Sequence, residues 1–431
     1  MSRINRYHVN GLLFGLSLWL CAPLTTAWGA TVPCGPGDTA CLVNAITAAN
    51  TSGQDTTITL ATGTYLLQAP ASPFTGLPVI TGTITITGAG AALTTLARDP
   101  APSLGPFRLF EVGPSGTLTL SGLTLTGGGA YPMAGGAILT AGTLTLRDAL
   151  VRGNQAMTGG AVSSHGTTHI ERSRFEHNIA HFSGGALAVD GGELTLDRST
   201  VAHNFAQGFG GGIANTFFFS AGGTVRIFNS AITENSSDLP GGGGIANDGV
   251  LELTSTTLSG NSEVSHFGRA GALYNGLGTA TLTNCTVTGN FNVFGVFGAT
   301  PAVFNEQGTV LLENTILALN AGAGGILGAN CEGVITSLGA NILGDRTGCT
   351  LTLAADDLTS DPLLNNLADD GLPGDAVWPL IAGSPAINAA HAAGCPATDQ
   401  LGNPRVGRCD IGAVEFQPPG QRVARLTRPN R

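Results

Sequence analysis

Three outward-facing side chains in the first half of the sequence could carry out acid–base chemistry. His169, Glu171 and Asp197 occupy polar positions in two successive copies of a thirteen-residue repeat. If the copies stack, Arg147 and Glu193 lie on the same face, so carboxylates, an imidazole and a guanidinium come within reach of one another. Such a face could supply a general acid and base or bind Ca²⁺. The alternative, which we favour, is a solvated strand face with charge pairs between neighbouring coils.

A second column of titratable residues falls at position twelve of the repeat. His177 and His203 take this position in successive copies, and Glu234 follows in the next. Two imidazoles and a carboxylate could hold a transition metal. Other copies carry Gly here, beside a turn, so we interpret these residues as facing water and predict no metal site.

Phenylalanines gather in the segments that connect the repeats. They either fold back over the coil as a local core, which we favour, or form an exposed apolar patch that binds a partner. The candidate binding residues are Phe209, Phe217, Phe218, Phe219 and Phe294.

The repeat that positions these side chains opens on Gly and closes on Asn. Its copies span residues 142–154, 166–178, 192–204, 223–235, 249–261, 278–290 and 308–320. Apolar residues at positions three and five alternate with Thr or charged residues, which is typical of a strand with one buried face. A bend at position seven, a small residue at eight and an apolar residue at ten predict a second short strand. Since neither strand buries its apolar side alone, the pattern predicts an all-β, single-stranded parallel β-helix.

The final Asn of each copy predicts a column of stacked amides. Asn tolerates turn conformations, and its side chain can bond to the copy in the next coil. The expected ladder is Asn154, Asn178, Asn204, Asn235, Asn261, Asn290 and Asn320. The connectors between the copies vary in length while the repeat does not, so insertions are confined to one sector, which in solenoids is often the binding face.

Both ends of a β-helix expose strand edges that must be covered. Asp38 can cap a helix over residues 41–50 that Gly53 can end, and this helix is predicted to cover the N-terminal end. Strands are expected to follow at residues 58–60, 63–67, 83–87 and 109–112. Residues 30–350 would then form the β-helix, residues 351–416 an irregular C-terminal cap, and residues 417–431 a disordered basic tail.

Composition and targeting signals limit the function. The chain has no Lys and a net charge of −10, which argues against nucleic acid as a partner. Residues 1–29 are typical of a signal peptide, and no later segment resembles a transmembrane helix. In an exported protein, three local disulfides are expected, from Cys34 to Cys41, Cys331 to Cys349 and Cys395 to Cys409. Cys285 is left over, and its repeat position marks it as a small inward residue.

Three parts of the chain resemble known families. Residues 41–50, with Asp55-Thr56-Thr57-Ile58, are similar to the CSLREA domain of exported bacterial β-helix proteins, although CLVNA replaces CSLREA. The GGA[IL] and FxxN motifs of the repeats resemble those of polymorphic outer-membrane proteins. Residues 383–388 (GSPAIN) and 409–416 (CDIGAVEF) resemble the choice-of-anchor Q region. These resemblances imply a right-handed parallel β-helix on an exported, surface-associated protein.

We therefore predict a right-handed parallel β-helix of about eleven coils. Its expected function is that of an exported, non-catalytic, adhesin-like protein, a monomer that binds a cell-surface glycan or protein. The expected location is secreted or on the cell surface, with the periplasm as another option. The alternative is a polysaccharide lyase or glycoside hydrolase of the pectin-lyase-like type, which would use His169, Glu171 and Asp197. No cofactor is expected, except Ca²⁺ in the case of a lyase.

Overall fold

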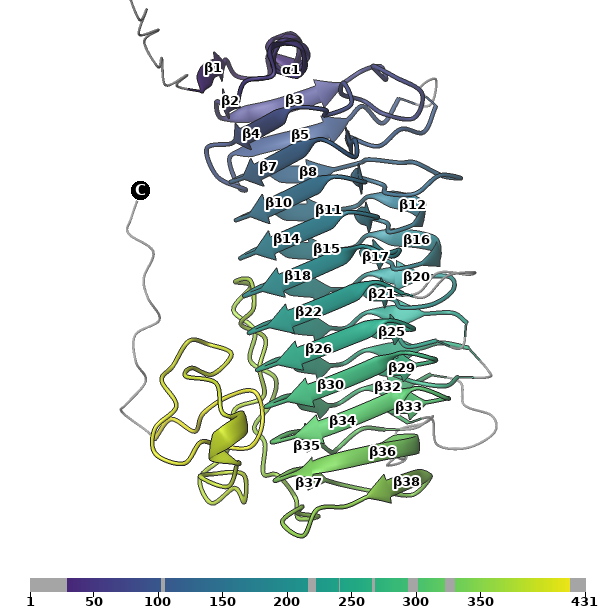
Figure 1. Cartoon of the computed structure of the whole chain (residues 1–431), viewed down its shortest axis with the longest axis vertical. Coiled ribbons are helices and arrows are strands. Elements are labelled where there is room, and N and C mark those ends of the chain that lie inside the picture. Colours follow the sequence, from purple (N-terminus) through teal and green to yellow (C-terminus); the bar gives the residue numbers. More distant parts are fainter. Residues whose placement is uncertain are drawn as a thin grey trace, which may run out of the picture.

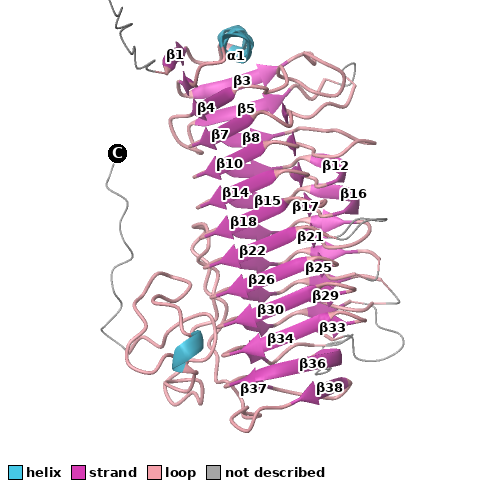
Figure 2. Ribbon diagram, in the orientation of Figure 1, coloured by secondary structure: helices cyan, strands magenta, loops and turns pink. Residues whose placement is uncertain are grey.

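The protein forms a right-handed parallel β-helix, as predicted (Figure 1). The computed structural model describes residues 29–101, 105–215, 222–239, 241–265, 268–293, 301–321 and 330–418. The strands stack in three parallel sheets. One of these sheets contains eleven strands, one from each coil. At about 4.8 Å per coil, the stack is roughly 50 Å long. The described part of the chain has one α-helix, at the N-terminal end (Figure 2).

The largest sheet, sheet A, holds two strands from most coils. Its strands are β1 (Ala30–Cys34), β2 (Thr56–Leu60), β4 (Thr83–Thr87), β6 (Phe110–Val112), β7 (Thr117–Ser121), β9 (Ile138–Thr140), β10 (Thr143–Arg147), β13 (Val162–Ser164), β14 (Thr167–Glu171), β17 (Leu187–Val189), β18 (Glu193–Asp197), β21 (Ile213–Asn215), β22 (Thr224–Phe228), β25 (Ile245–Asn247), β26 (Val250–Thr254), β29 (Leu273–Asn275), β30 (Thr279–Thr283), β33 (Val303–Asn305), β34 (Thr309–Glu313), β36 (Cys331–Gly339) and β38 (Cys349–Thr352).

The second sheet, sheet B, carries the second strand of each repeat. Its strands are β3 (Gly63–Leu67), β5 (Thr94–Arg98), β8 (Thr124–Thr126), β11 (Leu150–Arg152), β15 (Arg174–Glu176), β19 (Thr200–Ala202), β23 (Ala231–Thr233), β27 (Thr257–Ser259), β31 (Thr286–Thr288), β35 (Ile316–Leu317) and β37 (Ile342–Leu343).

A third sheet, sheet D, begins directly after the closing Asn of the repeat, in segments that the sequence analysis treated as connectors. Its strands are β12 (Gln155–Thr158), β16 (Ile179–Ser183), β20 (Phe205–Ala206), β24 (Ser236–Ser237), β28 (Ser262–Glu263) and β32 (Phe291–Asn292). Four of these six strands have only two residues, which is too short to show a period in the sequence.

The predicted alternation of apolar and polar residues directs the apolar side chains into the core of the solenoid. Leu146, Ile170 and Leu196 pair in register across three coils, and each is at most 2% exposed. The bend at position seven has a positive φ in all seven copies, from 45° at Arg172 to 52° at Asn314. The backbone at position twelve also has a left-handed conformation, which explains why Gly recurs there.

The predicted Asn ladder is confirmed. Each side-chain Nδ2 in the column donates to the Oδ1 of the next Asn at 2.9–3.0 Å, from Asn154 through to Asn320. The backbone N–H of each ladder residue donates to the same Oδ1, as Asn204 does to Asn235 at 3.1 Å. The ladder continues past the last repeat to Asn330. These bonds satisfy buried amides that would otherwise be costly to enclose.

Two further ladders were not predicted. Asn215, Asn247 and Asn275 form a second amide column that ends at Asn305, with Nδ2 to Oδ1 distances of 2.7–2.8 Å. Hydroxyls at position eight form a third column, in which Ser199 accepts from the backbone N–H of Ser173. In the sequence alone, position eight is recognisable only as a small residue.

The N-terminal cap agrees with the prediction. Helix α1 (Thr39–Ser52) begins after Asp38, whose Oδ1 accepts from the backbone N–H of Cys41 at 2.9 Å, and ends at Gly53, which is left-handed. Its buried residues are Leu42, Ala45, Ile46 and Ala49. The expected strands at residues 58–60, 63–67 and 83–87 lie within β2, β3 and β4, and the one at 109–112 matches β6 except for Leu109. The three predicted disulfides are present, and Cys285 is free and buried.

The C-terminal region, predicted to form an irregular cap, covers more than the end of the stack. Asp357 does cover the end of the stack, where its Oδ1 accepts from the backbone N–H of Asn341 at 3.1 Å. Residues 362–416, which we call the C-terminal strap, then run back along the outside of sheet B, beside the stack rather than beyond it (Figure 1). The strap includes the short 3₁₀ helix η2 (Ala392–Gly394) and reaches back to β15, where Asp369 approaches Arg174.

Candidate functional site

The candidate catalytic carboxylates belong to a row of ion pairs at the corner between sheets A and B. We call this the arginine–carboxylate row; it comprises Arg147, Asp148, Glu171, Arg172, Asp197 and Arg198. These residues occupy positions six and seven of three successive repeats. The in-register pairing of Arg147, Glu171 and Asp197 on β10, β14 and β18 places them one above another.

Every carboxylate oxygen in this row accepts a hydrogen bond. Glu171 Oε2 accepts from Arg147 at 3.2 Å, and its Oε1 accepts from Arg198 at 2.9 Å and also from Arg172. Arg172 also makes a bidentate pair with Asp148, with both distances 3.1 Å. The Asp148 carboxylate thereby raises the pKa of Arg172.

Asp197 is held in the same way. Its Oδ2 accepts from Arg198 Nε at 3.0 Å, and its Oδ1 accepts from Asn229 Nδ2 at 2.9 Å. His169 is exposed two residues before Glu171 and lies in register between Thr145 and Thr195. Among the described residues, no hydrogen bond or ion pair joins His169 to either carboxylate. Glu193 is also exposed, at the start of β18.

The histidine column does not form a chelating group. The rings of His177 and His203 stack with centroids 5.2 Å apart and an interplanar angle of 11°. His203 Nδ1 lies 3.0 Å from Glu234 Oε2. A metal ion needs several donors that converge on one point, whereas these rings lie face to face. Within the described ranges, no cluster of three or more His, Cys, Asp or Glu could hold a metal ion.

Of the five phenylalanines predicted to bind a partner, only Phe209 lies within the described residues. Its ring contacts Phe182 edge to face with centroids 5.9 Å apart, and it closely approaches Gly241. Phe209 is half-buried, which agrees with local packing over the coil. Phe217, Phe218, Phe219 and Phe294 lie outside the described residues.

A row of neutral polar side chains on sheet D was missed by the sequence analysis. We call it the amide–imidazole row; it comprises Gln155, His181 and Gln207, which come from β12, β16 and the residue after β20. Gln155 Nε2 contacts His181 Nε2, and His181 Nδ1 lies 3.3 Å from Gln207 Oε1. Tyr131 packs edge to face on the imidazole with centroids 4.6 Å apart. Since these residues follow the repeat at unequal intervals, no sequence period marked them.

A cluster on the outer face of sheet A is internally paired. Arg269 lies 5.4 Å over the Phe304 ring, which stacks on Tyr274 with centroids 5.9 Å apart. Glu306 accepts from both Tyr274 and Arg269, and the Tyr274 bond lowers the pKa of Glu306. This network satisfies its own charges and hydrogen bonds, so we assign it a structural role.

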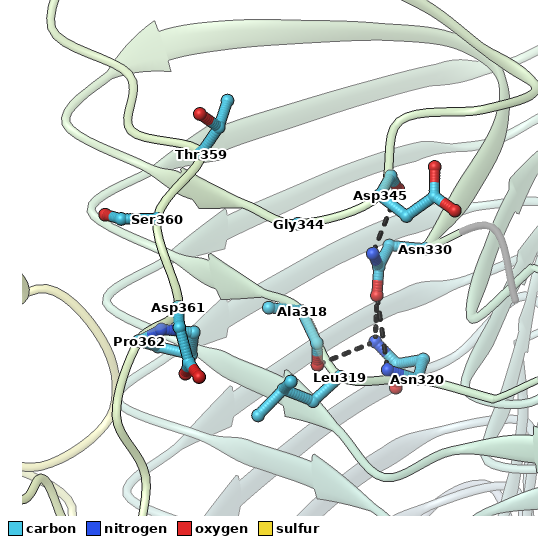
Figure 3. A pocket seen from close by; sticks show the side chains of 10 residues that line it. All are labelled: Ala318, Leu319, Asn320, Asn330, Gly344, Asp345, Thr359, Ser360, Asp361 and Pro362. Carbon is cyan, nitrogen blue, oxygen red and sulfur yellow. Dashed lines mark hydrogen bonds between the residues drawn. The ribbon is translucent and has the colours of Figure 1, made fainter. Parts of the chain in front are cut away.

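A pocket of about 110 Å³ lies where the Asn ladder ends (Figure 3). Asn320 and Asn330 form one wall, and residues 359–362 form the opposite one. Binding pockets for small molecules are usually about 300–1,000 Å³. This cavity is therefore too small to enclose a ligand of that size.

Solved structures that are similar to this chain match it with low sequence identity and low TM-scores. The A-module of mannuronan C-5 epimerase AlgE6 from Azotobacter vinelandii is 14% identical, with a TM-score of 0.40 over 77% of this chain and 98% of that one. The A-module of AlgE4 from the same organism is 14% identical, with a TM-score of 0.41 over 76% and 98%. The PL6 family alginate lyase AlyGC is 13% identical, with a TM-score of 0.29 over 88% and 60%. No family model and no curated protein matches the sequence.

The resemblances to the CSLREA and choice-of-anchor Q regions thus stay predictions, as does the signal peptide. Among the described residues, no helix has the length and apolarity needed to cross a bilayer. The three disulfides are compatible with an oxidising, extracytoplasmic location.

Proposed function

We propose that this chain is an exported, non-catalytic β-helix protein that binds a glycan or protein partner at the cell surface through one flank of its solenoid. The observation that carries the proposal is the arginine–carboxylate row. A nucleophile, a general base or a calcium ligand needs a carboxylate oxygen that can reach a substrate or an ion. Glu171 and Asp197 have both oxygens engaged by side chains of this chain.

The row has a structural explanation of its own. Like charges directly opposite each other in neighbouring strands repel, and Glu171 and Asp197 are paired in register. Arg198 donates to both carboxylates and so relieves this repulsion. Cross-coil charge pairing, the alternative that the sequence analysis favoured, accounts for these residues without a substrate.

The C-terminal strap covers one side of the solenoid, and this limits where a partner can bind. The strap occupies the outer face of sheet B from β19 to β35, through bonds such as Gly374 N–H to Thr200 Oγ1 at 2.8 Å. Sheet D carries no such cover from the strap in Figure 1. We therefore propose that the partner binds on the flank of the solenoid formed by sheet D.

The proposal is tested by measuring binding to a panel of acidic glycans, neutral glycans and cell-surface proteins. We expect wild type and the double variant Glu171→Gln/Asp197→Asn to bind the same partner with affinities within about threefold. A folded double variant that no longer binds would contradict the proposal, because the charged face would then be the ligand site. Circular dichroism provides the control for folding.

A further inference from the structure

We infer that the amide–imidazole row of sheet D is a binding site for an extended, neutral glycan. This inference rests on the proposed function and deepens it, because it names the class of ligand and the surface that takes it. The row and the flanking Tyr131 follow the long axis of the solenoid, one coil after another.

The chemistry of the row suits sugar hydroxyls. A hydroxyl both donates and accepts hydrogen bonds, and an amide or a neutral imidazole offers one group of each kind. Gln155 and Gln207 are exposed, and His181 between them is half-buried. The amides therefore keep hydrogen-bonding capacity toward solvent beyond their contacts with His181.

An apolar surface accompanies the polar row. Tyr131 is 48% exposed, Met133 is 44% exposed and Ile179 is 39% exposed. Sugar rings present C–H faces that pack on aromatic and aliphatic side chains, while their hydroxyls point to the sides. An aromatic ring with a polar tip, as in Tyr131, combines both kinds of contact.

Charge favours a neutral ligand. Strands β12, β16 and β20 contain no Asp, Glu, Lys or Arg. The next coil contributes an exposed carboxylate, Asp238, whose backbone N–H bonds to Ala206 beside Gln207. With a net charge of −10 on the chain, an acidic polysaccharide would meet repulsion here and find no guanidinium on these strands.

The spacing favours an extended chain over a single sugar. His181 and Gln207 lie one coil apart, and coils repeat at about 4.8 Å. Successive residues of an extended β-linked glycan advance by a similar step, so neighbouring coils can contact neighbouring sugars in the same way. A monosaccharide would use only one step of the row.

Calorimetric titration with neutral β-1,4-linked hexasaccharides and a uronate hexasaccharide tests the inference. We expect the neutral ligand to bind, its monosaccharide not to bind measurably, and the uronate to bind at least about tenfold more weakly. His181→Ala and Gln207→Ala should each weaken binding about tenfold, the effect of losing one hydrogen-bonding side chain. Gln307→Ala, an exposed glutamine outside the row, is the matched control and should bind like wild type.

Three outcomes would overturn the inference and leave the proposed function standing: preference for the uronate, neutral binding insensitive to both variants, or binding of a cell-surface protein with none of the hexasaccharides. Shortening of a hexasaccharide by wild type would instead overturn the proposed function. Unfolding midpoints of the variants distinguish lost contacts from lost structure.

Discussion

At the scale of single residues, buried amides do more to join the coils than the surface charges do. Asn235 is fully buried; it accepts from the backbone N–H and the Nδ2 of Asn204 and donates to Asn261 and to the Val201 carbonyl. Replacing it leaves several buried groups without partners, and each such group costs about 1–3 kcal/mol. By contrast, an exposed ion pair contributes about 0–1 kcal/mol.

Asn235→Ala should therefore lower the free energy of unfolding by about 4 kcal/mol, from two or more unsatisfied buried groups. Urea unfolding followed by circular dichroism measures the change. The matched control is Asn366→Ala, an exposed site at which the change should stay within about 0.5 kcal/mol. Equal effects of the two variants would mean that the ladder does not hold the coils together.

The position of Cys285 in the repeat indicates a structural rather than a catalytic role. Burial raises the pKa of its thiol to about 12, well above the ordinary value. Since the thiolate is the reactive form, only about one chain in ten thousand would carry it at pH 8. The sequence already indicated this role, because the other copies place Ser, Thr or Ala at position eight.

A chain beginning at Ala30 should accordingly show no thiol that reacts with an aromatic disulfide reagent at pH 8 in the folded state. In guanidinium it should show one, because the other six cysteines form disulfides. Labelling of the native protein in proportion to chain concentration at pH 8 would contradict this assignment.

At the scale of elements, the sequence predicted the strands of the repeat and the N-terminal helix, and it missed sheet D and the strap. The thirteen-residue period was enough to place the strands of sheet B, the Asn ladder and the buried Cys285. Sheet D was missed because its strands are short and the segments after them vary in length. The strap was missed because its irregular backbone gives no period, so only its contacts reveal where it lies.

The strap also explains a pattern that the repeat alone leaves unexplained. Position nine of the repeat carries Leu150 and Arg174 in the coils near or beyond the strap's tip, but Thr200, Ala231, Thr257 and Thr286 beneath the strap. These small side chains leave room for the strap. Thr200 and Thr286 accept from strap backbone N–H groups, and Thr257 donates to the side chain of Gln400. Ile316, the remaining residue at position nine, is large and packs into an apolar cluster with strap residues such as Leu380 and Ile411.

Thr257→Arg should displace the strap. It removes the bond from Thr257 Oγ1 to Gln400 at 2.7 Å and forces a long side chain into a fully buried position, which typically costs about 1–3 kcal/mol. Hydrogen exchange of the amides at residues 374–400 should become about tenfold faster or more. Leu150→Arg, at the same repeat position on uncovered β11, should leave that exchange unchanged. Unaltered protection in Thr257→Arg would show that the strap does not depend on this contact.

At the scale of the whole molecule, the solenoid presents sides of different character. The corner between sheets A and B carries paired charges, sheet B is covered by the strap, and sheet D exposes neutral polar and aromatic side chains. The sequence predicted the architecture and the charged face. It could not show that both carboxylate oxygens of Glu171 and of Asp197 accept hydrogen bonds, since these partners depend on side-chain placement across coils. We therefore propose that a partner binds on the exposed flank and that the charged corner has a structural role.

The most direct measurement is the formation of new chain ends when the purified protein is incubated with the glycan it binds, sampled over hours and with Ca²⁺ present and absent. We expect no ends above those of a buffer control, for wild type and for Glu171→Gln alike. New ends that accumulate with wild type and disappear in a folded Glu171→Gln or Asp197→Asn variant would contradict this expectation, and would make the arginine–carboxylate row a catalytic site.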